Sequence, residues 1–149
     1  MSIIAKNKKA GFLYTFLETF EAGIVLKGTE VKSLRNKKVN ISDGYAKFRN
    51  NEMFVVGMNI SPYEQGNRAN HEPARDRKLL LHRCEIKRLA GKVQTKGLTI
   101  IPIALYFNKR GIAKLELSLG KGKSFADKRE KIKKRTLERD IIREMLNRN

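Results

Sequence analysis

The sequence is poor in the residues that build disulfide scaffolds, cysteine-based metal sites and membrane spans. Its 149 residues include one cysteine, Cys84, together with two histidines, three prolines and no tryptophan. A single cysteine excludes an intramolecular disulfide and a zinc cluster made of cysteines. The longest apolar run, residues 98–107, has about half of the ~20 residues that a membrane-spanning helix needs. The first ten residues lack the apolar region of a secretory signal, so we expect a cytoplasmic protein.

Acidic residues are also scarce. There are 15 Asp and Glu against 33 Lys and Arg, which gives a formal net charge of +18. Such an excess repels itself unless an anionic partner or counterions offset it. Nucleic acid is the partner class that fits best, and an anionic membrane surface fits less well. The length allows one domain with a hydrophobic core.

Strand patterns dominate the chain up to residue 120. Residues 1–10 look irregular and basic, and residues 61–77 form a long polar loop, either functional or disordered. Alternating apolar residues and turn residues predict strands at 12–26, 45–49, 53–59, 78–81, 98–107 and 112–119, with helices after Gly28 and over 83–96. This arrangement suggests a small closed barrel.

Several positions within these elements have a specific predicted role. Gly23 permits a bulge or a close approach, and Pro102 indicates an edge position or a bulge. His82 and Glu85 are expected to cap the second helix, which ends at Gly97. In the last strand, the residues expected to point inward are Ala113, Leu115, Leu117 and Leu119, and those expected outward are Lys114, Glu116 and Ser118.

The stretch from Phe20 to Ala46 contains a helix-like segment after Gly28, with Lys32 and Arg35 beside its apolar face. Cations held next to a turn make a plausible surface for a phosphate backbone. The segments EAG (21–23), GTEVKSLR (28–35) and NISD (40–43) occur without gaps in an order that resembles the signature of the SmpB, or SsrA-binding protein, family. That family partners tmRNA in bacterial ribosome rescue. The resemblance implies a mainly β fold, an OB-like antiparallel barrel with packed helices, and a function that is not enzymatic.

The resemblance also assigns partners and sites. It implies binding of the tRNA-like domain of tmRNA (SsrA RNA), delivery of that RNA to stalled ribosomes for trans-translation, and elongation factor Tu as a companion through charged tmRNA. No cofactor or metal is expected. The RNA-binding positions that match the family are Asn7, Lys8, Glu21, Lys32, Arg35, Lys78, Leu80 and His82. From the residues themselves, we interpret Gly120–Lys123 as a basic hinge whose Lys121 and Lys123 contact phosphates.

Residues 121–149 form a basic tail after a barrel domain at 1–120. The tail holds eleven Lys or Arg and five Asp or Glu, and Leu137, Ile141 and Met145 recur at helical spacing. We expect it to be disordered when free and helical on the ribosome. The resemblance implies that the tail senses the empty mRNA channel beyond the decoding centre. At the position of Ala126 in this tail, next to Phe125, relatives often have a His or Tyr. Asp127, Lys128 and Arg129 match an Asp-Lys-Arg triplet of the family. The tail residues expected to contact the ribosome are these three together with Lys133, Lys134 and Arg135.

Two other functions remain open at this point. The first is a structural ribosomal protein or a general RNA-binding barrel, which would bind through stacking aromatics or through shape and phosphates. The aromatic candidates for stacking are Tyr14, Tyr45 and Tyr106. The second is a metal-dependent nuclease, which would need several carboxylates converging on one site. The best candidates are Glu18, Glu21, Glu30 and Asp43, although Glu30 is more simply an ion-pair partner of Lys32 or Arg35.

Overall fold

A seven-stranded antiparallel sheet forms most of the protein. The computed structural model describes residues 2–66 and 70–123, and also residues 129, 133, 136, 137, 139 and 141–143. The sheet has the order β1-β8-β9-β2-β7-β5-β4. Its strands are β1 (Ser2–Lys6), β2 (Tyr14–Ile24), β4 (Tyr45–Arg49), β5 (Glu52–Val56), β7 (Arg77–Leu80), β8 (Thr99–Phe107) and β9 (Ala113–Gly122). The predicted mainly antiparallel β class is therefore confirmed.

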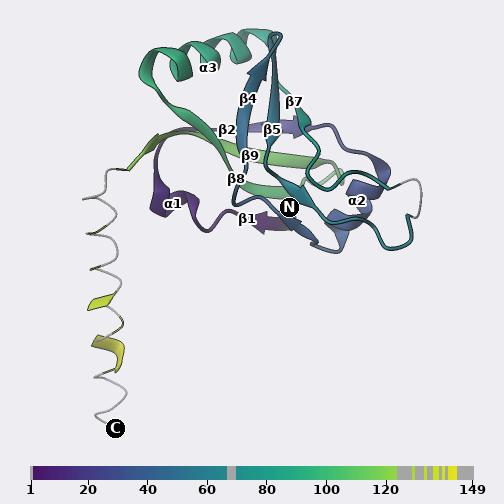
Figure 1. Ribbon diagram of the computed structural model, residues 1–149, viewed down its shortest axis with the longest axis horizontal. Helices are drawn as coiled ribbons and strands as arrows, with labels where there is room; N and C mark the ends of the chain where they lie inside the picture. The colour runs from purple at the N-terminus through teal and green to yellow at the C-terminus, as the bar shows by residue number, and fades with distance from the viewer. Residues whose placement is uncertain are drawn as a thin grey trace.

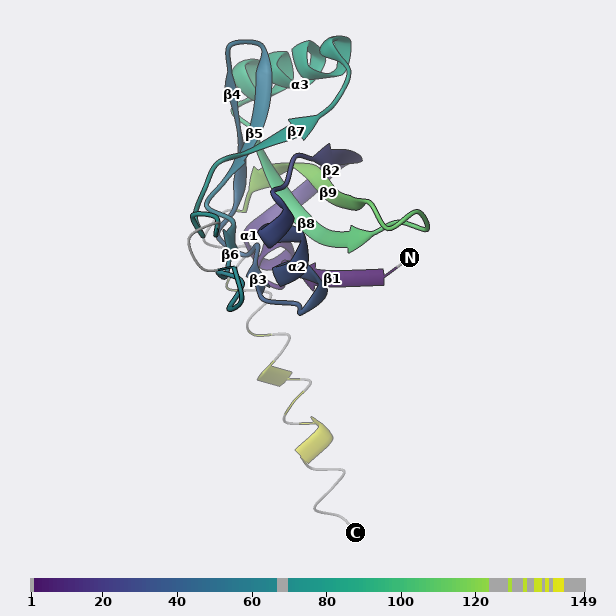
Figure 2. The same ribbon diagram turned by 90° about the vertical axis from the view of Figure 1, so that its right-hand side faces the viewer.

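Within residues 2–66 and 70–123, three helices and a short second sheet surround these strands. The helices are α1 (Ala10–Leu13), α2 (Gly28–Arg35) and α3 (Arg83–Lys96), and the second sheet pairs β3 (Val39–Asn40) with β6 (Asn59–Ile60). Figure 1 shows α1 and α2 at opposite ends of the fold. In Figures 1 and 2, the tip of the β4–β5 hairpin rises beside α3, away from α2. α1, α2, and α3 together with the β4–β5 hairpin thus lie at three separate parts of the surface.

The sheet is strongly curved, but hydrogen bonds do not close it into a barrel. The pairing of β2 with β9 and of β8 with β9 shifts register near Phe16 and Pro102, and such bulges bend a sheet. β4 consequently comes close to β8, although the two strands are not neighbours in the hydrogen-bonding order. The second edge of β8 is occupied from Ala104 to Phe107 by β1 instead. The prediction of a closed barrel is therefore wrong in this respect.

The prediction that residues 1–10 form an irregular arm is also wrong. Residues 2–6 pair with β8, and Ile4 is buried while Ile3 is exposed. Asn7 ends the strand: its amide nitrogen donates to the carbonyl of Pro102 at 2.9 Å, and its Oδ1 accepts from the backbone of Ala10 at 3.1 Å. The segment is ordered by partners about a hundred residues later in the chain, which local composition does not reveal.

The predicted hinge at Gly120–Lys123 begins inside a strand. β9 continues through Gly122 and pairs with Tyr14, Thr15 and Phe16 at the start of β2. Gly120 lies against Tyr14, because a Cβ built there would be 3.2 Å from the Cβ of Tyr14. A domain boundary drawn at residue 120 thus falls within β9.

Most of the predicted elements and inward faces are confirmed. In β9 the four residues expected inward are buried, but Ser118, expected outward, is buried as well and donates to the carbonyl of Glu18 at 3.0 Å. Pro102 lies at a bulge within β8, which is one of the two predicted positions, and β1 pairs with β8 only from Ala104 onward. α3 ends at Gly97 with φ 63°, as predicted, but His82 at its N-terminus makes no side-chain capping bond. None of the helices among the described residues is long and apolar enough to cross a membrane.

The described residues of the tail are helical and exposed. They include Arg129 and Lys133, as well as the apolar Leu137, Ile141 and Ile142. The predicted contact residues Asp127, Lys128, Lys134 and Arg135 lie outside the described residues, as do Phe125 and Ala126. A tail that is disordered when free stays a prediction.

Candidate RNA-binding surface

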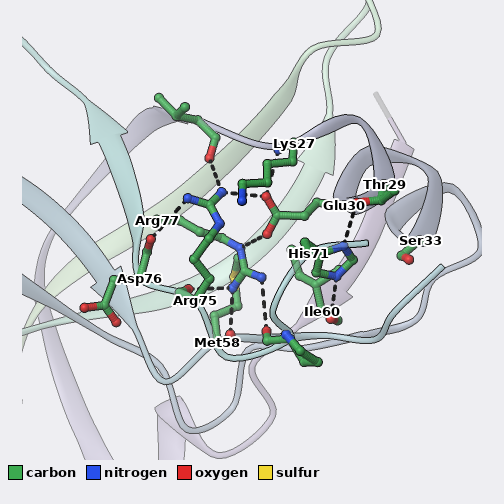
Figure 3. A network of polar contacts seen from close by, with 12 residues as sticks. Lys27, Thr29, Glu30, Ser33, Met58, Ile60, His71, Arg75, Asp76 and Arg77 are labelled. Carbon is green, nitrogen blue, oxygen red and sulfur yellow. Dashed lines mark hydrogen bonds and ion pairs between the residues drawn. The ribbon is translucent and has the colours of Figure 1, made fainter. Parts of the chain in front are cut away.

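Helix α2 is held in place by a buried carboxylate. The side chain of Glu30 is 0% exposed and forms ion pairs with two arginines from the far end of the 61–77 loop. Its Oε1 accepts from Nη2 of Arg75 at 2.5 Å and from the backbone N–H of Lys27 at 2.7 Å, and its Oε2 accepts from Nε of Arg77 (Figure 3). The prediction that Glu30 is an ion-pair member is therefore confirmed, but its partners are Arg75 and Arg77 instead of the exposed Lys32 and Arg35.

Arg77 is the other buried member of this cluster. Its Nη1 donates to the carbonyls of Met58 at 2.8 Å and Arg75 at 2.9 Å, and its Nη2 donates to the carbonyl of Pro73 at 3.0 Å. All three nitrogens of a guanidinium that is 0% exposed thus have acceptors. A buried charge needs such complete pairing, because the loss of hydration is otherwise very costly.

The pKa of Glu30 follows from the same contacts. Burial by itself would raise the pKa of this carboxyl group. Hydrogen bonds from Arg75, from the backbone of Lys27 and from Arg77 outweigh the effect of burial, so the pKa is lowered from its ordinary value of 4.5. Glu30 is consequently an anion that is satisfied by protein groups, with a structural role.

The loop from Ser61 to Arg77 is fastened to α2 at further points. His71 is buried between Thr29, whose Oγ1 lies 2.9 Å from its Nδ1, and the carbonyl of Ile60, 2.8 Å from its Nε2. Ser33 of α2 donates to the carbonyl of Ser61 at 2.7 Å. The described part of this loop is a brace for α2 (Figure 3).

The brace leaves the cations of α2 facing outward. Leu34 and Ser33 are buried, whereas Lys32 and Arg35 are exposed. The Nζ of Lys32 lies 5.3 Å from the ring centroid of Tyr63, within the range of a cation–π contact. Two positive charges on a helix that cannot easily rotate are well suited to phosphate oxygens.

A groove of about 610 Å³ brings together four of the predicted RNA-binding residues. The four are Glu21 from β2, Lys78 and Leu80 from β7, and His82 at the start of α3. They converge because β2 pairs with β7, with Gly23 opposite Leu80. A Cβ on Gly23 would lie 3.2 Å from the Cβ of Leu80, which confirms the predicted close approach at this glycine.

The groove combines three carboxylates, Glu21, Glu52 and Glu85, with cations and an exposed apolar side chain. Leu80 is 54% exposed, so it is not a core residue. Nζ of Lys78 lies 3.1 Å from a carboxylate oxygen of Glu52, and Glu21 is exposed. A carboxylate at this position can accept hydrogen bonds from a base amino group or a 2′-hydroxyl, while the cations attract phosphates.

Sequence reasoning did not single out every residue of the groove. Lys114, Asn51 and Arg83 also line it. Lys114 was expected to point outward from its strand, but the sequence did not show which strand lies next to it. Its pairing with Gly23 places it beside β2. Asn51 comes from the tip of the β4–β5 hairpin, which no local pattern places next to α3.

The remaining predicted residues lie at the α1 end of the fold. Lys8 is exposed in the turn before α1, and Lys121 is exposed at the end of β9. Nζ of Lys123 donates to the carbonyl of Gly11 in α1 at 2.7 Å, which fastens the end of β9 to that helix. Asn7 has the structural contacts described above. The predicted positions thus divide among α2, the groove and the α1 end.

The carboxylates considered for a nuclease do not gather. Glu18 pairs with Arg88 at 2.7 Å and Lys92 at 2.8 Å on α3, while Glu30 is buried with its arginines. Within residues 2–66 and 70–123 and the few described tail positions, no group of three His, Cys, Asp or Glu residues is placed to hold a metal ion.

Comparison with known proteins identifies the family. The family model described as "SmpB protein" matches residues 4–147. The SsrA-binding protein of Moorella thermoacetica is 57% identical over 143 residues, covering 96% of this chain and 92% of the relative. That of Thermosipho africanus is 53% identical over 149 residues, covering 100% and 99%.

A solved structure agrees with the sequence relatives. It is described as "tmRNA-SmpB: a journey to the center of the bacterial ribosome", and it matches with a TM-score of 0.69 and 49% identity over 86% of this chain and 93% of that one. The chain therefore belongs to the SmpB family, whose members bind RNA and are not enzymes.

Proposed function

We propose that this protein binds tmRNA through its folded body and acts with it on ribosomes in trans-translation. The relatives that match nearly the whole chain are named for binding SsrA, and the matching solved structure concerns tmRNA, SmpB and the ribosome. With ribosomes as a partner, its place of action is the cytoplasm. A structural ribosomal protein is the alternative.

The observation that carries this proposal is the convergence of Glu21, Lys78, Leu80 and His82 on one groove. These residues come from β2, β7 and the position just before α3, and the sequence resemblance described above implies an RNA contact for each of them. Lys78 and Lys114 supply positive charge for phosphates, which positions an RNA without reading its sequence. Glu21 supplies an acceptor that ordinary phosphate binding does not need, and Leu80 supplies an apolar contact.

The groove favours a folded RNA over a single strand. Recognition of folded RNA depends on shape, on phosphates and on 2′-hydroxyl groups. Lys32 and Arg35 on the braced α2 add fixed charges at a second place on the surface. Together these contacts would hold the tRNA-like domain in one orientation, so the protein would stand in for an anticodon arm that this RNA lacks.

Two finer steps belong to the same proposal. The protein would deliver charged tmRNA to stalled ribosomes with elongation factor Tu as a companion. The tail, which includes Arg129 and Lys133, would enter the vacant mRNA channel beyond the decoding centre. Its exposed Leu137, Ile141 and Ile142 support a helix that finds its partner outside the body. Sedimentation of the protein with ribosomes separates the two functions. A rescue factor should be substoichiometric and enriched on stalled ribosomes, whereas a ribosomal protein should be present in equal amounts on stalled and translating ones.

A paired substitution tests the groove directly. Glu21 and Glu116 are cross-strand neighbours on β2 and β9, but only Glu21 lines the groove. We expect the wild-type protein to bind the tRNA-like half of tmRNA more tightly than an elongator tRNA near physiological salt. Glu21→Ala should remove this preference, and Glu116→Ala should retain it. Equal binding of both RNAs by the wild-type protein would favour a general RNA-binding protein instead.

A further inference from the structure

A second hollow, of about 420 Å³, lies between α1, the turn before β4 and β8. Its size is within the range of about 300–1,000 Å³ typical of small-ligand sites. It shares no lining residue with the groove that contains Glu21. The residues that line it are Asn7, Ala10, Leu13, Tyr14, Ser42, Asp43, Gly44, Tyr45, Thr99 and Ile101.

Tyr45 gives the hollow an accessible aromatic ring. It is 46% exposed, whereas Tyr106 is buried and Tyr14 is only partly accessible. Along β4, Tyr45, Lys47 and Arg49 are exposed, while Ala46 and Phe48 pack against the core. The outer face of β4 therefore begins with an aromatic ring in the hollow and continues with Lys47 and with Arg49, which is paired with Asp76 at 3.0 Å. An aromatic ring next to a cation is a combination that binds unpaired nucleotides.

The walls of the hollow are preformed. The turn that carries Asp43 is closed by a hydrogen bond from the backbone of Gly44 to the carbonyl of Ile41 at 3.1 Å and by one from Ser42 to Oδ1 of Asn40 at 2.9 Å. On the opposite side, the Asn7 side chain is held by hydrogen bonds to the backbone of Lys9, Ala10 and Pro102. A rigid cavity loses little conformational freedom when it binds a ligand.

Asp43 is the polar group best placed to contact a ligand there. It is exposed, and its carboxylate lies 3.9 Å from Nζ of Lys9, a distance at which an exposed pair is weak and separates easily. A carboxylate accepts hydrogen bonds, so it can pair with an N–H donor of a base, either an exocyclic amino group of adenine, cytosine or guanine or the ring N–H of guanine or uracil. Lys8, Lys9 and Lys47 are exposed nearby or on the same strand face and can contact the adjoining phosphates.

We propose that this hollow, bordered by Tyr45 and Asp43, is a binding site for one unpaired RNA base, which stacks on Tyr45. The inference depends on the proposed function only for the class of ligand, RNA. An unpaired base has the required chemistry whether it belongs to tmRNA or to ribosomal RNA. The bound base would give the body a second contact with RNA, independent of the groove.

The absence of tryptophan from the sequence makes a direct test possible. Tyr45→Trp retains a stacking ring and introduces the one tryptophan of the chain, which can be excited selectively over the tyrosines. Phe16→Trp, at an exposed aromatic position outside the hollow, is the matched control. We expect the fluorescence of Tyr45→Trp to be quenched on binding either the tRNA-like half of tmRNA or small ribosomal subunits. Whichever of the two quenches the tryptophan fluorescence contains the base that stacks on position 45. Quenching by neither RNA, or no greater than that of Phe16→Trp, would overturn the proposal.

Affinities provide the second measurement. Loss of one stacked base weakens binding by about 5- to 150-fold, so Tyr45→Ala should weaken binding to the quenching RNA within this range, and Tyr45→Phe should remain within about twofold of wild type. Tyr45→Ala with unchanged affinity for both RNAs would refute stacking. Because the preference of the wild-type protein for the tRNA-like half is measured without these variants, failure of the hollow and failure of the proposed function can be told apart.

Discussion

Glu30 of α2 and Arg77 of β7 lie 47 residues apart in the sequence and meet as an ion pair with both side chains fully buried. Through this pair, the start of β7 and the end of the long loop hold α2 against the sheet. The surface charges Lys32 and Arg35 follow Glu30 on the same short helix. The position of these charges is therefore set by an interaction below the surface.

Removing one partner of this pair should be strongly destabilising. Glu30→Ala leaves Arg77 buried without its counter-ion, and we expect the free energy of unfolding to fall by about 3–5 kcal/mol. Glu64→Ala removes an exposed partner of Lys38 and should change it by about 0–1 kcal/mol. Urea unfolding of both variants measures the difference. Similar small losses in the two variants would show that the buried pair does not hold the fold together.

Stability should depend on pH through the same carboxylate. Because the pKa of Glu30 is lowered from 4.5 in the folded protein, its contribution is fully present above that value and is lost as the pH falls through the lower, folded pKa. The hydrogen bonds from Lys92 and Arg88 lower the pKa of Glu18 as well, so both groups act in the same direction. In urea titrations from about pH 6 to about pH 3, Glu30→Gln should lose less stability than wild type. An equal or greater loss in Glu30→Gln would exclude Glu30 as a source of the acid sensitivity.

Two glycines should respond to alanine with opposite signs. Gly57 has φ +75°, and a Cβ there would lie 2.6 Å from the backbone oxygen of Asp43, so Gly57→Ala should destabilise by at least about 1–2 kcal/mol. Gly91 is exposed inside α3 with nothing within 4 Å of its Cβ position. Gly91→Ala should therefore stabilise by about 0.5–1 kcal/mol. Thermal unfolding of both variants measures the effects, and a neutral Gly57→Ala would show that the turn near Asp43 can adjust.

The charges of α2 should appear in the salt dependence of RNA binding. If Lys32 and Arg35 each neutralise one phosphate, Lys32→Gln and Arg35→Gln should each weaken binding and reduce the slope of log affinity against log salt by about 1. Lys109→Gln, in the exposed turn between β8 and β9, is the control and should leave the slope unchanged. An unchanged slope in the α2 variants would place these cations away from the RNA.

Local sequence patterns predict the elements whose contacts are local. The alternation in β9 and the apolar stripe of α3, with Gly97 at its end, needed no knowledge of distant partners. β1 and the Gly120–Gly122 segment could not be predicted in this way, because their order comes from pairing with β8 and β2. Short or glycine-containing segments look irregular until the partner strand is known.

The candidate site shows the same division. Arg77 follows a polar loop and resembles a surface cation, and only the fold reveals the buried acid on α2 that neutralises it. Glu21, Lys78, Leu80 and His82 were suggested by resemblance to a family, but their convergence depends on the pairing of β2 with β7. The resemblance did not point to Lys114, which became a candidate only because the structure places it in the same groove, opposite Gly23.

The most direct test of the proposed function is a cell-free translation reaction on a message without a stop codon, supplied with tmRNA charged with alanine. We expect a degradation tag on the nascent chain only when this protein is present, and strong loss of tagging with Glu21→Ala but not with Glu116→Ala. Tagging that is equally efficient without the protein, or unaffected by Glu21→Ala, would contradict a role for the groove in bringing tmRNA to stalled ribosomes.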